Sequence, residues 1–581
     1  MSPRSRWRIA RPDAAGVASL ARALALPELT AACLVNRGLA SPERAAAFLE
    51  PRLKTLEDPF QLPDMDRAVD RLLRARSTGE RVVVFGDYDV DGVTSTALLT
   101  EVLTTLGWTV AQYLPHRRDE GYGLSQAAVE NCLSRFPGTF LLAVDCGSTA
   151  VSQIDWLGAR GVDVVVLDHH QVSDPLPAAV ALVNPQRKPG AEPYCSAGLA
   201  FKLAHALVKA GRQQGLPGFE TYNLKPLLDL VALGTVADLV PLMGENRILV
   251  QAGLERIGVT PRPGLVALKE VARTRNPVRV HEVAFQLGPR LNAAGRLETA
   301  EDALRLLLSP GIEEARRLAD SLDRSNRERQ EVEKRIAAEA VARVRERFDP
   351  ERDRVIVEGD AGWHIGVVGI VASRVLREFH RPTLVLGGDG ELWRGSGRSV
   401  AGFDLAAALR DCSDLLEKHG GHAMAAGLSL SPAKVDALRE RLNALARERL
   451  SAEDLVPEVR LDAALPLGSV DLAVVAALRR LEPFGMGNPP VQLAVCGVRH
   501  ARAPQRLKDQ HWKFWLTDGC PPVETVWWGA GDREVPQGVF DVAVAPEESE
   551  YLGRRNLQLR LLDWRPAGLP EPESKNGALT P

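Results

Sequence analysis

Three short apolar segments between residues 80 and 185 each run directly into acidic or imidazole side chains. The segments are RVVVF, which leads into GDYD at 86–89; FLLAV, which leads into Asp145; and DVVVL, which leads into Asp168-His169-His170. Helix-like stretches separate them. Uninterrupted β-branched runs that alternate with helices predict a parallel sheet with helices on both faces. Ligands bind at the carboxyl edge of such sheets, so a functional site is expected there.

The acids at this edge repel one another and need compensation. Asp87, Asp89 and Asp91 stand at every second position, and a further acid, Asp238, follows an apolar helix in GTVADLVPL. A cation, a facing helix N-terminus or water can offset such repulsion. For Asp91 taken alone, a helix N-cap is the expected role.

The kinds of side chain in this cluster indicate which ions it would hold. Carboxylates with one or two imidazoles and no thiolate form a hard site that favours Mn²⁺ or Mg²⁺. More than four such ligands indicate two ions, roughly 3.5–4 Å apart and sharing one carboxylate. That arrangement suits in-line displacement at phosphorus.

Bulk composition narrows the class of protein. The 581 residues predict three or four structural units at ~150 residues each. With 72 basic and 75 acidic residues the net charge is −3, so any nucleic-acid surface must be a local groove. The seven cysteines are scattered without a CxxC, which favours reduced thiols over disulfides or structural zinc. No signal-like segment or membrane-length apolar run is seen, which predicts a soluble cytoplasmic protein without membrane association.

A long stretch without Gly or Pro separates the parts of the chain that precede it from those that follow. Residues 312–349 predict one connector helix about 57 Å long, apolar at its ends and wet in its polar middle, DRSNRERQE. Two shorter helices with a bend are the alternative. The expected parts are a helical segment at 1–75, the parallel-sheet domain at 76–310, the connector at 311–350, a second α/β domain at 351–450, a small β-barrel at 456–565 and a disordered Pro-rich tail at 566–581.

Several motifs resemble the DHH phosphoesterase superfamily and, within it, the RecJ branch of single-strand-specific 5′→3′ exonucleases. The superfamily motifs are GDYDVDGVTSTALL, VDCGS, LDHHQ and GTVADLVPL, and the branch motifs are PRLNAAGRL, GWHIGVVGIVASR, GSGRS, GGHAMAAG and LEPFGMGNP. The resemblance runs from about residue 8 to 565. One departure is Val90, where the family usually has Ala; it leaves Asp87 and Asp89 intact.

The resemblance implies a fold and a catalytic centre. The fold would be a DHH parallel-sheet domain, a long connector helix, a DHHA1-like α/β domain and a C-terminal OB-fold barrel. Two Mn²⁺ or Mg²⁺ ions would be bound, with Asp145 the candidate bridge; the implied ligands are Asp87, Asp89, Asp145, His169 and Asp238. His170 would be a ligand or reach the scissile phosphate. Asp168 would orient a histidine, and Asp91 would also support the ligands without contacting the metal itself.

A phosphate pocket and a DNA-binding barrel are also implied. Arg117, Ser396 and Arg398 would bind the terminal 5′ phosphate and so set polarity, with Arg296 and His422 as further contacts. We expect GGHAMAAG to place His422 before a helix start, where backbone N–H groups favour phosphate. A surface salt bridge is the alternative for each Arg, and a satisfied core histidine the alternative for His422.

The barrel sequence places aromatic residues beside Lys and Arg residues, a combination that suits binding of single-stranded nucleic acid. Lys508, Trp512 and Lys513 are the candidate contacts, because bases stack on aromatic rings while cations follow phosphates. In the alternative interpretation, Trp512, Phe514 and Trp515 alternate in and out of a strand. At least one of these three aromatics should then be buried.

The implied activity is single-stranded-DNA-specific 5′→3′ exonuclease action that releases 5′ mononucleotides. The strand would be threaded between the two α/β domains in a groove too narrow for duplex. The implied setting is DNA repair and recombination by a monomer, after a helicase and with single-strand-binding protein as a candidate partner. One competing function is a DHH enzyme for very short oligonucleotides, cyclic dinucleotides or a nucleotide bisphosphate, which the 456–565 segment disfavours. Another is a non-catalytic DNA scaffold, which the retained acids disfavour.

Overall fold

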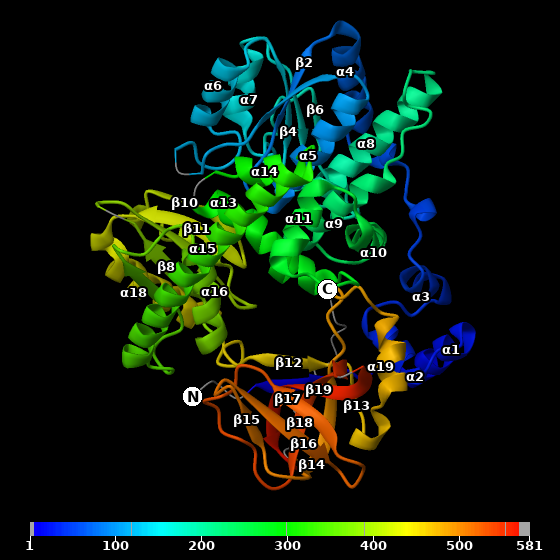
Figure 1. Ribbon diagram of the computed structural model, residues 1–581. Coiled ribbons are helices and arrows are strands. Elements are labelled where there is room, and N and C mark those ends of the chain that lie inside the picture. The colour runs from blue at the N-terminus through cyan, green and yellow to red at the C-terminus, as the bar shows by residue number, and fades with distance from the viewer. Residues whose placement is uncertain (1–4, 118, 298, 389, 552, 569–581) are drawn as a thin grey trace. The chain divides into compact units, whose positions relative to one another are not determined.

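The computed structural model of the chain describes residues 5–568 apart from 118, 298, 389 and 552 (Figure 1). Most of the tail expected from residue 566 therefore lies outside the described residues. The chain forms two compact units. Unit 2 comprises Glu43–Arg327 and Leu481–Pro490, and unit 1 comprises Met1–Pro42, Glu328–Arg480 and Val491–Pro581.

Unit 2 contains the predicted parallel sheet. Its strand order is β3-β2-β4-β5-β6 and every pairing is parallel. The strands are β2 (Arg81–Phe85), β3 (Thr109–Tyr113), β4 (Phe140–Val144), β5 (Val164–Leu167) and β6 (Ala181–Val183). β2, β4 and β5 coincide with the three apolar segments and are neighbours in the sheet, so their carboxyl ends lie at one edge.

Helices cover both faces of this sheet, as predicted. Alternate strand residues such as Val82 and Val84 pack with α4, α5 and α8, whereas Val83 and Phe85 pack with α6 and α7. Figure 1 shows α6 and α7 on one side of the strands and α5 and α8 on the other. The helices of this unit are α3 (Pro42–Leu49), α4 (Met65–Thr78), α5 (Val90–Thr105), α6 (Gln126–Arg135), α7 (Val151–Gly158), α8 (Ser196–Gln213), α9 (Leu228–Ala237), α10 (Gly244–Val259), α11 (Pro263–Ala272), α12 (Val280–Glu282), α13 (Gly288–Leu297) and α14 (Glu301–Leu307).

The connector is one helix, α15 (Ile312–Arg347), which confirms that prediction. Its polar middle, predicted to be solvent-exposed, is exposed on one face only, as at Arg324, Arg327 and Glu331, and is buried on the other. Asp323, Asn326, Arg329 and Glu333 are buried there. Asp323 accepts a hydrogen bond from Arg290 at 2.9 Å, and Glu333 pairs with Arg329 and Arg374, each at 2.6 Å. Ion pairing offsets the desolvation of these charges, so a polar helix face can be buried.

Unit 1 contains a second α/β body with strand order β10-β11-β9-β8-β7. Only the β7–β8 pairing is parallel. The elements are β7 (Ile356–Asp360), α16 (Val368–Phe379), β8 (Thr383–Gly387), β9 (Trp393–Arg398), α17 (Leu405–Arg410), β10 (Lys418–His422), β11 (Ala425–Leu430) and α18 (Val435–Arg449).

The helix start expected at GGHAMAAG is wrong. Residues 418–430 form an antiparallel hairpin that pairs Lys418 with Ser429 and His422 with Ala425. A two-residue turn at Ala423-Met424 joins the strands. His422 therefore ends an exposed strand and has no helix N-terminus beside it.

The predicted β-barrel is confirmed as a closed ring of five strands. Neighbours around the ring are β14, β18, β19, β17 and β16, and a β14–β16 pairing closes it. The elements of this region are β12 (Glu458–Leu461), β13 (Ala463–Ala464), α19 (Leu472–Arg479), β14 (Leu493–His500), β15 (Gln505–Leu507), β16 (His511–Thr517), β17 (Val523–Trp527), β18 (Phe540–Tyr551) and β19 (Arg554–Pro566).

The N-terminal segment is not purely helical as expected. Helices α1 (Ala14–Leu24) and α2 (Glu28–Asn36) follow a strand, β1 (Arg6–Ile9), which pairs in parallel with β12. Trp7 of this strand is buried, and its indole N–H donates to Asp563 at 2.9 Å. Tertiary pairing thus decides the conformation of four residues that carry little strand signal of their own.

Among the described residues, no single helix combines the length and apolar character needed to cross a membrane. The bent pair of residues 14–24 and 28–36 passes that test only when both helices are taken together.

Substitutions in the barrel test the inward face of β16. Phe514→Ala removes a fully buried ring, so we expect the barrel to lose about 3–5 kcal/mol of stability. Trp528→Ala, at a ring that is 52% exposed, should change stability by no more than ~0.5 kcal/mol. Hydrogen exchange of the β14–β19 amides, followed by mass spectrometry, measures both. Equal protection in the two variants would contradict this assignment of the core.

Candidate metal centre

The structure brings the predicted acids and histidines of unit 2 together. Asp87 and Asp89 follow β2, Asp145 follows β4, His169 and His170 follow β5, and Asp238 follows α9. These residues form three sets of possible metal ligands, and within each set the ligand atoms lie within 4.8 Å of one another. The sets are Asp87 with Asp89 and Asp145; Asp145 with His169 and His170; and Asp91 with His169 and Asp238. Asp145 belongs to two of the sets, and so does His169.

Local backbone structure explains how the first acids are presented. The Asp89 carboxylate caps α5, accepting N–H groups from Asp91 at 2.9 Å and Gly92 at 3.1 Å. Residue 92 must be glycine, because a Cβ there would lie 2.5 Å from the Asp87 carbonyl oxygen. Asp145 has a φ of 64°, a conformation that costs energy in a non-glycine residue.

The expectation that Asp91 is a helix N-cap is wrong, because Asp89 is the N-cap of α5 and Asp91 lies in its first turn. The two carboxylate oxygens of Asp91 accept the backbone N–H groups of Ser196 at 2.6 Å and Ala197 at 2.8 Å, at the start of α8. The partial positive charge of that helix N-terminus therefore faces a fully buried acid. Asp91 thereby joins α5 to α8 beside the metal-ligand candidates.

Asp168 fixes the position of the two histidines that follow it, His169 and His170. Its carboxylate accepts backbone N–H groups from Ser148 at 2.9 Å and His169 at 2.8 Å, and it lies 2.8 Å from Nδ1 of His170. Burial opposes ionisation of Asp168, but the hydrogen bonds from His170 and Ser148 keep its pKa below the usual value. Burial likewise opposes the charged ring of His170, yet Asp168 raises the His170 pKa to about 9. The contact with Asp168 therefore favours the charged form of the His170 ring.

The protein alone does not offset the cost of ionising three further acids, Asp87, Asp145 and Asp238. Burial, and then the neighbouring carboxylates, raise the pKa values of Asp87 and Asp145, and raise that of Asp238 to about 9. Oδ1 of Asp87 and Nε2 of His169 are buried without a hydrogen-bond partner among the described residues. Burial lowers the pKa of His169, so its ring is neutral and can ligate a metal. Buried acids, an orphaned oxygen and an orphaned imidazole nitrogen fit divalent cations.

The residues predicted to contact phosphate fall in both units. In unit 2, Arg117 lies over the Tyr88 ring at 5.1 Å, and Arg296 is half-buried. In unit 1, Arg398 donates to Ser396 Oγ at 3.0 Å. Burial lowers the pKa of Arg398, and no described carboxylate forms an ion pair with it. A pocket that combines residues of both units stays a prediction.

The barrel candidates differ in their surroundings. Lys508 is exposed, whereas Lys513 pairs with Glu524 at 2.7 Å. Trp512 is half-buried, and Phe514 is fully buried, as the alternating interpretation requires. The roles of Lys508, Trp512 and Lys513 in DNA binding stay predictions.

Sequence reasoning missed two residues at the centre. Ser196 donates its hydroxyl to Asp145 Oδ1 at 3.0 Å. Tyr122 donates to the Asp145 carbonyl oxygen at 3.2 Å, and its ring centre is 6.0 Å from that of His170. The glycines on both sides of Tyr122 are a sequence signal for an exposed turn. No sequence signal marks Ser196, because its partner Asp145 lies 51 residues away in sequence.

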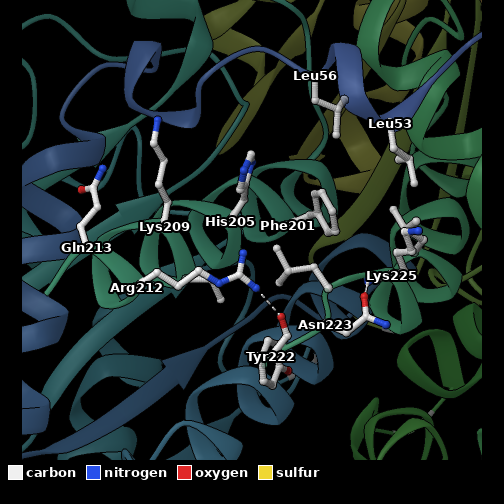
Figure 2. A pocket seen from close by; sticks show the side chains of 13 residues that line it. Leu53, Leu56, Phe201, His205, Lys209, Arg212, Gln213, Tyr222, Asn223 and Lys225 are labelled. Carbon is white, nitrogen blue, oxygen red and sulfur yellow. Dashed lines mark hydrogen bonds between the residues drawn. The ribbon is translucent and has the colours of Figure 1, made fainter. Parts of the chain in front are cut away.

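A separate hollow of about 480 Å³ lies in unit 2, between α8 and residues 53–56 and 222–228 (Figure 2). Its lining includes none of the predicted site residues. Lys209 on its rim pairs with Asp58 at 2.7 Å, and Arg212 donates to the carbonyl oxygens of Phe219 and Tyr222. These contacts give the Lys209 and Arg212 side chains a structural role without a bound ligand.

Known proteins resemble the chain along most of its length. The DHH family N-terminal domain matches residues 81–235, the DHHA1 domain residues 352–448 and the RecJ OB domain residues 461–563. These matches confirm the expected order of domain types, whereas their exact limits stay predictions. The single-stranded-DNA-specific exonuclease RecJ of Bacillus subtilis (strain 168) is 36% identical over 573 residues, which are 97% of this chain and 71% of that protein.

Two solved structures are similar in fold as well. RecJ from Thermus thermophilus in complex with Mn²⁺ has a TM-score of 0.83 and 33% identity, covering 99% of this chain and 81% of that one. The Mg²⁺ complex from the same organism has a TM-score of 0.78 and 33% identity, covering 98% and 79%.

Metal binding can be tested on Asp87 by thermal melting. Mn²⁺ at 100 times its dissociation constant should stabilise the wild type by ~2.7 kcal/mol. Asp87→Asn should reduce that gain strongly, yet melt no lower than the wild type in EDTA, because it removes a buried acid. Asp155→Asn, at an exposed position on α7, is the matched control and should keep the full gain. An unchanged gain in Asp87→Asn would contradict the site.

Proposed function

This chain belongs to the RecJ family of single-stranded-DNA-specific exonucleases, and we propose that it degrades single-stranded DNA from the 5′ end to 5′ mononucleotides. The observation that carries this proposal is the cluster of buried acids and histidines at the carboxyl edge of the parallel sheet. Asp87 Oδ1 has no hydrogen-bond partner among the described residues, and His169 Nε2 lies 3.4 Å from Asp145 Oδ1 and 3.6 Å from Asp238 Oδ2. Cations bound among these atoms would offset the buried negative charge. The closed barrel in unit 1 supports a polymeric substrate over a dinucleotide.

Two divalent ions, Mn²⁺ or Mg²⁺, would occupy the centre. Asp87, Asp89 and Asp145 would hold one, and Asp145, His169 and Asp238 the other. Asp145 is a member of two of the ligand sets, which supports its role as the shared carboxylate. When bound, such ions activate the attacking water and neutralise charge at the scissile phosphate.

His170 would contact the scissile phosphate. Asp168 favours the charged form of this ring, and a charged imidazole donates hydrogen bonds and cannot ligate a metal through the nitrogens that carry its protons. The 2.8 Å contact between His170 Nδ1 and Asp168 fixes the ring, leaving Nε2 as the donor to a phosphate oxygen. Asp168 thus acts by orienting His170 and holding its proton.

The polarity of degradation would come from a pocket for the terminal phosphate. Arg398 is an arginine without a carboxylate partner among the described residues, and its hydrogen bond to Ser396 orients its guanidinium. A phosphate would supply the missing negative charge, in a charge-assisted hydrogen bond. Arg117, Arg296 and His422 stay predicted contacts of the same substrate.

The wider setting is part of the same proposal. The enzyme would act as a monomer in the cytoplasm, in DNA repair and recombination. A helicase would expose the strand, and a single-strand-binding protein is a candidate partner. Threading of the strand between the two α/β domains stays a prediction.

End-blocked substrates test the polarity. A long single-stranded DNA carries an internal label and is blocked at its 5′ or its 3′ end, with Mn²⁺ present. We expect label release only when the 5′ end is free. Digestion from the 3′ end, or cleavage only of oligomers a few nucleotides long, would contradict the proposal.

The phosphate pocket is tested by Arg398→Ala. Loss of a charged hydrogen bond costs about 1.5–3 kcal/mol, so kcat/KM on 5′-phosphorylated DNA should fall roughly 10- to 100-fold. Activity on 5′-hydroxyl DNA should change far less. Arg394→Ala removes an exposed arginine from the same strand and should behave as the wild type. Equal losses on both substrates in Arg398→Ala would argue against a phosphate-specific role.

A further inference from the structure

We propose that Ser196 is a positioning residue that fixes the Asp145 carboxylate for metal binding; this rests on the ligand role proposed above for Asp145. Ser196 is the first residue of α8 and is fully buried. Its hydroxyl donates to Asp145 Oδ1 at 3.0 Å, in a hydrogen bond between two buried side chains.

Asp145 needs such a partner more than the other acids do. It is buried, its backbone is in the left-handed region at φ 64°, and it is surrounded by Asp87, Asp89 and Asp91. The χ2 torsion of aspartate is broad, so repulsion from these neighbours could turn the carboxylate away from a shared metal position. A carboxylate oxygen has two lone pairs, so Oδ1 can accept the Ser196 proton and still face a cation.

Ser196 is itself held in place by the acids of α5. Its backbone N–H donates to Asp91 Oδ2 at 2.6 Å, and that of Ala197 donates to Asp91 Oδ1 at 2.8 Å. Asp89 in turn accepts the N–H of Asp91 at 2.9 Å. A continuous series of hydrogen bonds therefore runs from Asp89 through Asp91 and Ser196 to Asp145. It connects two carboxylates of the same ligand set.

Helix capping does not account for the Ser196 hydroxyl. A serine at a helix start commonly caps the helix by accepting a backbone N–H. In α8 the capping residue is Cys195, whose Sγ accepts from Gly198 at 3.4 Å. The Ser196 hydroxyl is directed at the carboxylate, so its loss should affect Asp145 more than the helix.

The experiment measures Mn²⁺ affinity by isothermal titration of the full chain with manganese chloride. Loss of a residue that orients a ligand typically weakens metal binding about 10- to 100-fold, and we expect this for Ser196→Ala. Ser196→Thr keeps the hydroxyl and should bind close to wild type. Ser95→Ala is the matched control, because it removes an equally buried hydroxyl that donates to the Asp91 carbonyl at 2.6 Å. Its affinity should be unchanged.

Asp145→Asn separates this inference from the proposed function. If Asp145→Asn loses Mn²⁺ binding while Ser196→Ala binds as the wild type, the positioning role is wrong and the metal centre stands. If Asp145→Asn binds Mn²⁺ normally, the ligand role of Asp145 fails and the inference fails with it. Should Ser196→Ala not fold in EDTA, Ser196→Cys keeps the volume with only a weak donor and should show the same loss of affinity.

Discussion

The mutual repulsion of buried carboxylates at one sheet edge is the constraint on which the rest of this structure depends. β2 and β4 are neighbours, so Asp87 and Asp145 are forced together at their carboxyl ends. Burial makes this charge costly, as the raised pKa values of both acids indicate. In the proposed function, the same arrangement holds cations, which offset this cost.

Helix N-termini supply the compensation that the protein provides by itself. Asp89 caps α5, and Asp91 accepts two amides at the start of α8. These contacts partly offset the charge of both acids, although burial still raises the pKa of Asp91, and they fix the two helices against each other. Among the described residues, no helix N-terminus caps Asp87, Asp145 or Asp238, and the pKa values of these three acids lie well above the usual value.

Local patterns were sufficient where the signal is local. The apolar runs before Asp87, Asp145 and Asp168 predicted three strands of one parallel sheet, and the absence of Gly and Pro predicted α15. Features that depend on distant partners were missed. Trp7 lies in a strand only because β12 pairs with it, and Asp91 accepts two backbone N–H groups at the start of a helix that begins 105 residues later. One face of the polar middle of α15 is buried, and there Arg290 pairs with Asp323 and Arg374 pairs with Glu333.

Anomalous diffraction at the manganese edge, from crystals grown with Mn²⁺, tests the central claim most directly. The account predicts two manganese peaks about 3.5–4 Å apart, on either side of Asp145 and in contact with Asp87 and His169. A single peak at Asp145 would keep the metal centre but contradict the two-ion arrangement. Ordered carboxylates with no manganese between them would contradict the claim that these acids are buried together in order to hold cations.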